Sequence, residues 1–195
     1  MIERLESELR MEQRLTNRLW KFSRMVLMLS SVLVSCGSAF AGSQILRTIS
    51  PVLIYQDSGA LELVVGYETS PLGAQTTGVG ITVFFDRTKL SFVSLEALVE
   101  DGIVGLDNSS ASVRADRDDG DDDALTDAKV GIAYVSITGQ WPNEALPHTV
   151  ELFKATFELA DRDFIGETGV NFVITAGATG YESVNASVNV NIDPR

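Results

Sequence analysis

A short acidic segment, residues 115–127, holds the side chains of this sequence that are best suited to bind a metal ion. It contains seven aspartates within thirteen residues. Ca²⁺ takes about six to eight oxygen ligands in a flexible geometry, and clustered carboxylates supply such oxygens. The sequence therefore predicts a calcium site whose ligands come from Asp116, Asp118, Asp119, Asp121, Asp122 and Asp123.

The spacing of these aspartates differs from that of an EF-hand loop. If Gly120 took the sixth position of such a loop, Ala115 and Arg117 would take the first and third positions, which need acidic ligands. The alternative is a solvated loop without metal. In that case the like charges should repel one another and hold the segment open.

Two aromatic residues, Trp141 and Tyr181, are candidates for ligand binding. Trp141 is the one tryptophan after residue 41 and stands beside Pro142 in a predicted loop, while Tyr181 follows Gly180. An exposed aromatic ring can stack on a sugar or anchor a protein interface. The alternative for Trp141, which we favour, is a place at the end of the core.

The sequence offers little for catalysis or for zinc binding. It has no G-x-S-x-G motif, one histidine, His148, and one cysteine, Cys36. A zinc site of the Cys/His type needs several such ligands, and a nucleophilic triad needs a base beside its nucleophile. We therefore predict a protein that is not an enzyme, with a hydrolase of unrecognised type as an alternative.

The charge of residues 42–195 argues against nucleic acid as a partner. These residues hold nine Lys and Arg against 23 Asp and Glu, a formal charge of −14. Such a surface repels phosphate backbones. It is compatible with a soluble extracytoplasmic domain and with divalent cations.

The first 41 residues have the pattern of an export signal. Lys21 and Arg24 precede residues 25–46, which contain no charged residue, and a positive flank followed by an apolar run is typical of a secretory signal. The small-residue string A-F-A predicts cleavage before Gly42. The overlapping string L-V-S-C predicts instead a lipoprotein acylated at Cys36.

A third alternative is an uncleaved anchor, because the apolar run just reaches the ~20 residues that span a bilayer. Residues 1–24 are either an over-long n-region, with Met11 as the true start, or a cytoplasmic amphipathic helix. We expect an exported protein, periplasmic, at the cell surface or secreted. Any membrane attachment would be through the leader or a lipid at Cys36. The predicted division is a leader of residues 1–41 and one domain of residues 42–195.

That domain has the pattern of an all-β antiparallel sandwich of the jelly-roll type, with about nine strands. Alternating apolar and polar residues, separated by turn signals, mark strands and leave no convincing helix. Residues 129–138 are almost continuously apolar, which predicts a central strand covered on both faces. Pro51 should place its strand at an edge or split it. The clearest strands are residues 45–55, 60–67, 78–85, 89–95, 129–138, 150–159, 170–175 and 183–192.

The middle and end of the domain resemble the cohesin family and its jelly-roll relatives among the cellulose-binding modules. The resemblance rests on residues 78–95 (GVGITVFFDRTKLSFVSL), 102–105, 129–137, 152–159 and 166–176. It implies a non-catalytic module. One sheet face of a cohesin grips a small protein domain called a dockerin, while sugar-binding relatives use a groove or flat face.

The function predicted from the sequence is therefore an extracytoplasmic binding module that recognises a protein partner, dockerin-like, or a polysaccharide. The contact would be made by a sheet face or by loops at one end. Protein binding is favoured, because the chain has few aromatic residues for a sugar-binding platform. The alternative is a structural module of a cell-surface or matrix assembly that is stabilised by Ca²⁺ at the aspartates.

Overall fold

The computed structural model describes residues 42–48, 53–55, 60–144 and 146–194. The predictions of an export signal, of cleavage before Gly42 and of acylation at Cys36 concern residues 1–41 and lie outside the described residues. The described ranges contain no helix that could span a membrane.

The described chain forms twelve strands and one short 3-10 helix, η1. Alternation of apolar and polar residues explains most of the strands, because it places every second side chain on one face of a sheet. The elements are β1 (Gly42–Thr48), β2 (Leu53–Tyr55), β3 (Leu61–Ser70), β4 (Gly78–Phe85), β5 (Leu90–Ala97), β6 (Ile103–Leu106), η1 (Ser110–Ser112), β7 (Arg114–Ala115), β8 (Ala128–Val135), β9 (Val150–Leu159), β10 (Gly166–Ala176), β11 (Tyr181–Val184) and β12 (Ala186–Asp193).

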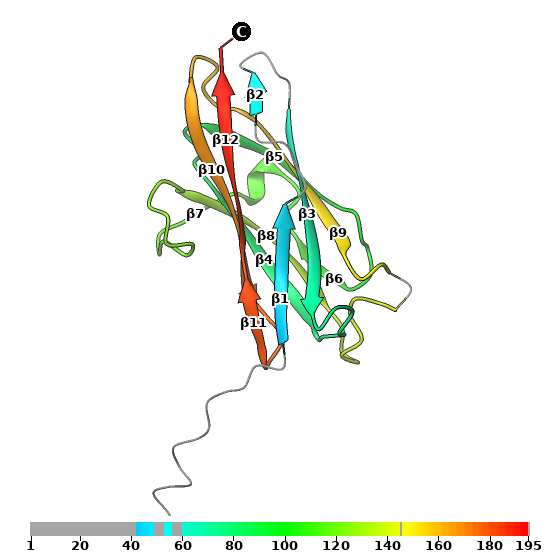
Figure 1. The fold of residues 1–195 in the computed structure, drawn as a ribbon. Coiled ribbons are helices and arrows are strands. Elements are labelled where there is room, and N and C mark those ends of the chain that lie inside the picture. Colours follow the sequence, from blue (N-terminus) through cyan, green and yellow to red (C-terminus); the bar gives the residue numbers. More distant parts are fainter. Residues whose placement is uncertain (1–41, 49–52, 56–59, 145, 195) are drawn as a thin grey trace, which may run out of the picture. The chain divides into compact units, whose positions relative to one another are not determined.

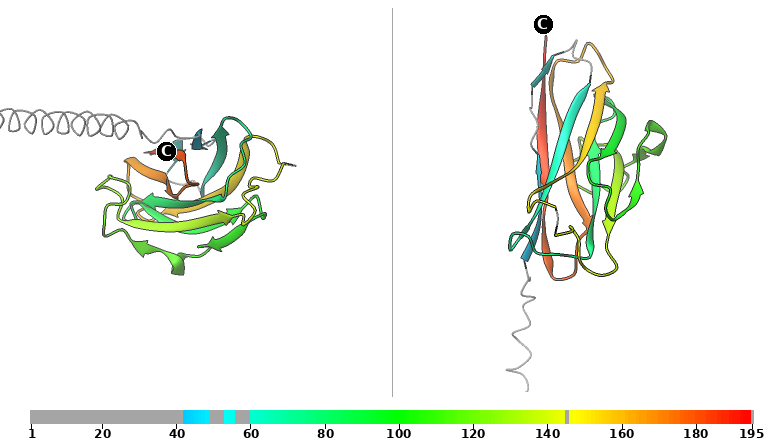
Figure 2. Two further views of the ribbon diagram at one scale, coloured as in Figure 1. Left: turned by 90° about the horizontal axis from the view of Figure 1, so that it is seen from below. Right: turned by 90° about the vertical axis from the view of Figure 1, so that its right-hand side faces the viewer.

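The strands form two sheets that pack face to face (Figure 1; end-on view in Figure 2, left). Sheet A has the order β11-β1-β3-β9-β5, and sheet B has the order β2-β12-β10-β4-β8-β6, with β7 also paired to β8. All neighbours are antiparallel except β1–β11 and β2–β12, which are parallel. The predicted fold class, an all-β sandwich of the jelly-roll type, is confirmed.

Two long stretches of the sequence, each with alternating apolar and polar residues, contribute one strand to each sheet. β11 pairs with β1 in sheet A, whereas β12, which begins two residues after β11 ends, pairs with β10 in sheet B. Between them, the Asn185 side chain accepts a hydrogen bond from the Ile174 amide at 2.9 Å. The run around Pro51 is divided in the same way into β1 and β2, with β2 at the edge of sheet B, as the proline predicted.

The prediction that residues 129–138 form a central strand covered on both faces is wrong. β8 ends at Val135 and lies one strand from the edge of sheet B, between β4 and β6. Its buried residues alternate with less buried ones such as Gly131 and Ala133. These outward residues are small rather than polar, which made the run read as continuously apolar.

Aromatic side chains fill both ends of the single core. At one end, Phe85 packs edge-on against Phe157 with ring centroids 5.2 Å apart, and Phe92 joins them. At the other end, Trp141 stacks on Tyr134 at 5.1 Å and lies 5.1 Å from Tyr67. Trp141 is 1% exposed, so the preferred prediction of a core position is confirmed.

A fully buried glutamine, Gln44, links β1 to three other parts of the sandwich. Its Nε2 donates hydrogen bonds to Tyr67 Oη at 2.8 Å and to the Gly78 carbonyl at 2.9 Å. Its Oε1 accepts a hydrogen bond from the Ala178 amide at 2.6 Å. This side chain therefore ties together β1, β3, β4 and the connection that precedes β11.

Candidate functional site

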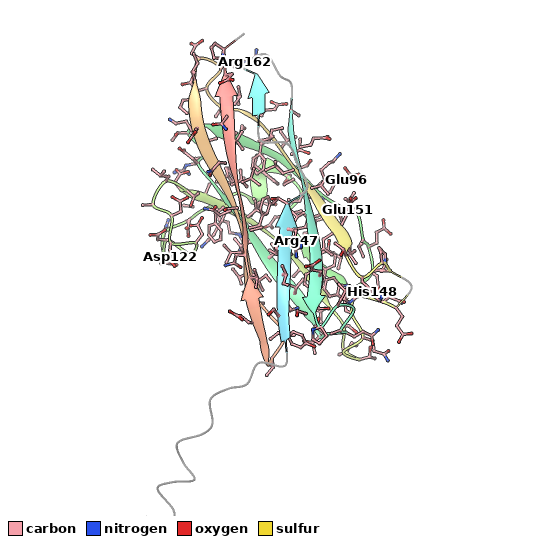
Figure 3. The ribbon with its side chains drawn as sticks, in the orientation of Figure 1. Arg47, Glu96, Asp122, His148, Glu151 and Arg162 are labelled. Atoms are coloured by element: carbon pink, nitrogen blue, oxygen red, sulfur yellow. The ribbon has the colours of Figure 1, made fainter. Side chains whose placement is uncertain are left out.

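The aspartate segment, residues 115–127, folds against the outer face of sheet B. Phe84 points outward from β4, yet it is 1% exposed. A Cβ atom on Gly120 would lie only 3.1 Å from the Phe84 ring, so the backbone of the segment rests on that ring. Figure 3 labels Asp122 in this projecting part of the chain. The segment therefore covers an apolar residue that water would otherwise meet.

Asp116 fixes the start of the segment to β8. Its side chain is buried, and its carboxylate accepts hydrogen bonds from Lys129 Nζ at 2.9 Å and from the Gly120 amide at 3.0 Å. Burial alone would raise the pKa of Asp116, but these donors outweigh it and the pKa lies below its ordinary value. Asp116 is thus an ionised, buried carboxylate.

Asp121 and Asp123 fix the rest of the segment to β10. The Asn171 amide group donates hydrogen bonds to Asp121 at 2.8 Å and to Asp123 at 3.0 Å. The buried Thr126 hydroxyl donates to Asp121 at 3.0 Å. Protein donors therefore compensate part of the negative charge, and the segment is closed onto the sheet instead of being held open by repulsion.

Three of the six predicted metal ligands converge. Asp116, Asp119 and Asp121 can each place a carboxylate oxygen within 4.8 Å of the other two. Asp118 and Asp122 are exposed and lie outside this group, and Asp123 is engaged by Asn171 and by the Leu125 amide. Hard oxygen ligands of this kind suit Ca²⁺, although Lys129 already neutralises Asp116.

Beyond the aspartate segment, the central strands of sheet B carry small, uncharged side chains on their outer face. On this surface, which we call the sheet-B face, Thr82 lies between Gly131 and Val173, and Gly80 lies opposite Ala133. The Thr82 and Thr175 hydroxyls are hydrogen-bonded at 3.1 Å. The side chains of the face are Gly80, Thr82, Gly131, Ala133, Val135, Val173 and Thr175. Cross-strand neighbours on the face are thus small or β-branched.

Exposed apolar side chains lie at the end of the sheet-B face away from the aspartates, on the face and beside it. Val135 is 48% exposed, Val104 on neighbouring β6 is 65% exposed, and Ile137 is fully exposed.

The outer face of sheet A is different, because ion pairs cross it. Lys154 lies 3.1 Å from both Glu62 and Glu96, and Arg47 pairs with Glu68. Figure 3 labels Arg47, Glu96 and Glu151 over this sheet.

Two adjoining pockets lie among the loops at one end of the sandwich. The larger, which we call the end cleft, has a volume of about 540 Å³ and reaches the edge of Trp141. The smaller, of about 280 Å³, is lined by Tyr67 and His148 among others. Trp141 therefore lines a pocket, but its ring faces are covered by Tyr67 and Tyr134 and cannot stack on a ligand. Tyr181, half-buried at the start of β11, lines neither pocket.

Sequence reasoning missed Phe84, Lys129 and Asn171, which hold the aspartate segment, and it missed Gln44. One signal was present for Phe84. It is an aromatic residue at an outward position of an alternating strand, next to inward Phe85, and such a position needs a cover. Nothing in the sequence indicated that residues about 45 positions apart, such as Asn171 and Thr126, would share the same carboxylate.

Comparison with known proteins identifies the fold. No family model and no curated protein sequence matches the chain. Among solved structures, the seventh ScaB type I cohesin from Pseudobacteroides cellulosolvens is similar, with a TM-score of 0.50 and 10% identity over 78% of this chain and 94% of that one. The domain therefore has a cohesin-like jelly-roll fold, and the resemblance seen in the sequence is confirmed.

Two further cohesin structures are also similar. The cohesin module of a family 33 glycoside hydrolase from Clostridium perfringens has a TM-score of 0.49 and 10% identity, covering 80% of this chain and 99% of its own. A type I cohesin in complex with a dockerin, from Clostridium thermocellum, has a TM-score of 0.45 and 14% identity over 77% of this chain and 99% of its own.

Proposed function

We propose that residues 42–195 form a non-catalytic module that binds a folded protein partner, of the dockerin type, through the sheet-B face. The observation that carries this proposal is the contrast between the two outer faces. Ion pairs cross the outer face of sheet A, whereas the sheet-B face consists of uncharged, small side chains and adjoins exposed Val104 and Ile137. The cohesin-like fold supports the same function.

The cost of desolvating charged side chains explains why a partner would bind sheet B rather than sheet A. The cores of protein interfaces are depleted in charged residues, because each buried charge must be paired again on binding. A partner that covered sheet A would have to desolvate Lys154, Glu62 and Glu96 together. The side chains of the sheet-B face are uncharged, and the carboxylate beside it, Asp107, already accepts a hydrogen bond from the Gly131 amide. The glycines of the face allow a partner backbone to approach closely.

The test is site-directed cross-linking in extracts of the source cells. A photoreactive benzoylphenylalanine in place of Val135 is expected to cross-link one predominant protein, identified by mass spectrometry. Adding Ala133→Arg should weaken binding of that protein about 100-fold, because an unpaired charge would be buried in the interface. Ala133 lies between Gly80 and Gly105, so the arginine can stand on the surface without disturbing the core.

The matched control is Ser91→Arg, which adds the same side chain to an exposed position of β5 on sheet A. It should leave binding unchanged. Circular dichroism verifies that both variants fold. Equal loss of binding in the two variants, or cross-linking from sheet A alone, would overturn the proposal.

A second function, a calcium-stabilised structural module of a surface or matrix assembly, is favoured by one observation, the convergence of Asp116, Asp119 and Asp121. If Ca²⁺ binds there, Ca²⁺ at 100 times its Kd should add ~2.7 kcal/mol to the free energy of unfolding. Thermal unfolding of the full chain in EDTA, CaCl₂ and MgCl₂ measures this gain, which should raise Tm by several degrees in CaCl₂ alone.

Two aspartate variants provide the control for the calcium experiment. Asp119→Asn removes one of the three converging carboxylates, whereas Asp118→Asn removes an exposed carboxylate outside the group. The calcium-dependent rise in Tm should be lost in the first variant and kept in the second. An equal rise with Mg²⁺, or in both variants, would mean general screening of charge and would exclude this site.

We also propose that the protein is exported to the periplasm, the cell surface or the medium. The support is the charged flank at Lys21 and Arg24 followed by the uncharged residues 25–46. The mass of the mature chain distinguishes a start at Gly42 from an acylated Cys36 and from an uncleaved anchor.

A further inference from the structure

The end cleft lies where three connections meet, before β4, before β6 and after β8. Two backbone hydrogen bonds join the first to the third, from the Thr76 amide to the Trp141 carbonyl at 2.7 Å and back at 3.1 Å. The Trp141 indole N–H donates to the Asp101 carbonyl at 3.1 Å, which attaches the connection before β6. Because these hydrogen bonds hold all three connections together, the cleft exists before any ligand arrives.

A glycine keeps the floor of the cleft open. Gly102 has a φ of +81°, and a Cβ there would lie 3.0 Å from Trp141 Cδ1 and 3.1 Å from the Val135 carbonyl. The Val135 amide donates to the Gly102 carbonyl at 2.7 Å. A side chain at this position would therefore be strained and would displace the indole that forms the base of the cleft.

The chemistry of the cleft favours a cation. Among its lining residues the charged side chains are two carboxylates, Asp101 and Glu144, and none is a lysine or arginine. Gln75 and Gln140 add amide oxygens, which are further acceptors. The excess negative charge of residues 42–195 adds to the attraction of a positive group.

The end cleft is continuous with the sheet-B face. Val135 belongs to that face and also lines the cleft, and fully exposed Ile137 lines it as well. A partner seated on the sheet-B face would therefore extend over the cleft. A long side chain with an apolar stem and a charged head could pass Val135 and Ile137 and reach the carboxylates.

We propose that the end cleft receives an arginine side chain of the protein partner. This inference rests on the proposed function, since the arginine belongs to the protein that docks on the sheet-B face. A guanidinium group carries five N–H donors in a planar fork and is the cation best suited to bind carboxylate and amide oxygens together at an interface. Arginine side chains seated in pockets are also frequent hot spots of protein interfaces.

A sugar is the competing ligand, and the cleft suits it less well. Sugar sites commonly offer the face of an aromatic ring for stacking. The indole faces of Trp141 are covered by Tyr134 and Tyr67, and only its edge reaches the cleft. The lining carboxylates would also remain without a counter-charge.

Trp141 is a built-in reporter for the test, because its indole forms part of the cleft. In the full chain with Trp20→Phe, Trp141 is the single tryptophan. Its fluorescence is followed while the peptide acetyl-Gly-Arg-Gly-amide is added, with the neutral citrulline peptide of the same shape in parallel. The arginine peptide should bind about tenfold more tightly than the citrulline peptide, and more weakly as salt rises.

Variants locate the binding. Asp101→Asn with Glu144→Gln should raise the Kd of the arginine peptide about tenfold, while Glu158→Gln at an exposed position of β9 should not change it. Equal binding of the two peptides, no fluorescence change with arginine, or a change produced by cello-oligosaccharide alone would overturn the inference.

The outcome is separable from that of the proposed function. If cross-linking from position 135 succeeds and the arginine peptide fails to bind, the docking function stands and the role of the cleft falls. If the peptide binds and no protein cross-links to the sheet-B face, the cleft is a cation site without a protein partner, and the proposed function falls.

Discussion

Replacing Trp141 by alanine is expected to lower the free energy of unfolding by about 3–5 kcal/mol. The indole is 1% exposed, stacks on Tyr134, packs on Tyr67 and donates a hydrogen bond to the Asp101 carbonyl. Its removal leaves a large cavity at one end of the core and detaches the connection before β6. Urea unfolding of the full chain, followed by circular dichroism, measures the loss.

The variant Trp141→Phe separates the two contributions. Phenylalanine retains most of the apolar bulk but lacks the indole N–H. The free energy of unfolding should therefore fall by about 1 kcal/mol for the lost hydrogen bond, and by a further small amount for imperfect packing. If Trp141→Ala lost no more than Trp141→Phe, the ring would not support the core in the way that its burial indicates.

Replacing Gln44 by leucine is expected to lower the free energy of unfolding by a similar amount, about 3–5 kcal/mol. Leucine is apolar and one bond shorter, and it offers neither donor nor acceptor. The substitution would remove a hydrogen-bond partner from the Gly78 carbonyl, the Ala178 amide and the Tyr67 hydroxyl. Water could not replace it, because position 44 is fully buried. Thermal unfolding should show a decrease in Tm of roughly 10 °C.

Gln140→Leu is the matched control, because the same substitution is made at an exposed glutamine. It should change the free energy of unfolding by less than about 0.5 kcal/mol. Nearly equal effects of the two substitutions would show that the hydrogen bonds of Gln44 contribute little, and that another feature joins β1 to the rest of the sandwich.

The strands of the sandwich could be predicted because a half-buried strand has an alternating sequence. β9 and β12 illustrate this, since their inward residues are apolar and most of their outward residues are polar. What alternation cannot reveal is the sheet to which a strand belongs. The run that includes Asn185 keeps its period of two while the chain passes from sheet A to sheet B, and only long-range packing determines that point.

The aspartate segment could be located from composition, but its conformation could not be predicted. Three of its carboxylates accept hydrogen bonds from Lys129 and Asn171, on strands that follow it by up to about 50 residues. Charge counting within the segment gave repulsion and an open loop, because the compensating donors lie elsewhere in the chain. The same limitation explains why only three of the six predicted ligands converge.

The sheet-B face was not predicted because its residues are not distinctive one by one. Gly131 and Ala133 alternate with buried Val130 and Ile132, and small outward residues in a sequence look like part of the core. They become a surface only when β4 and β10 bring Gly80, Thr82 and Val173 beside them. A surface made of three strands is a property of the register between those strands.

The parallel pairing of β1 with β11 has a consequence for the order of folding. Gly42 lies beside Tyr181 and Ile45 beside Val184, so the first and nearly the last described strands are neighbours. Contacts between residues so distant in sequence require closure of a very long loop before they contribute any stability, and chains rich in such contacts fold slowly. During synthesis, β1 cannot complete its place in sheet A until residues 181–184 have emerged. A chain that ended before β11 would leave β1 and β10 with unpaired edges, and such edges promote aggregation.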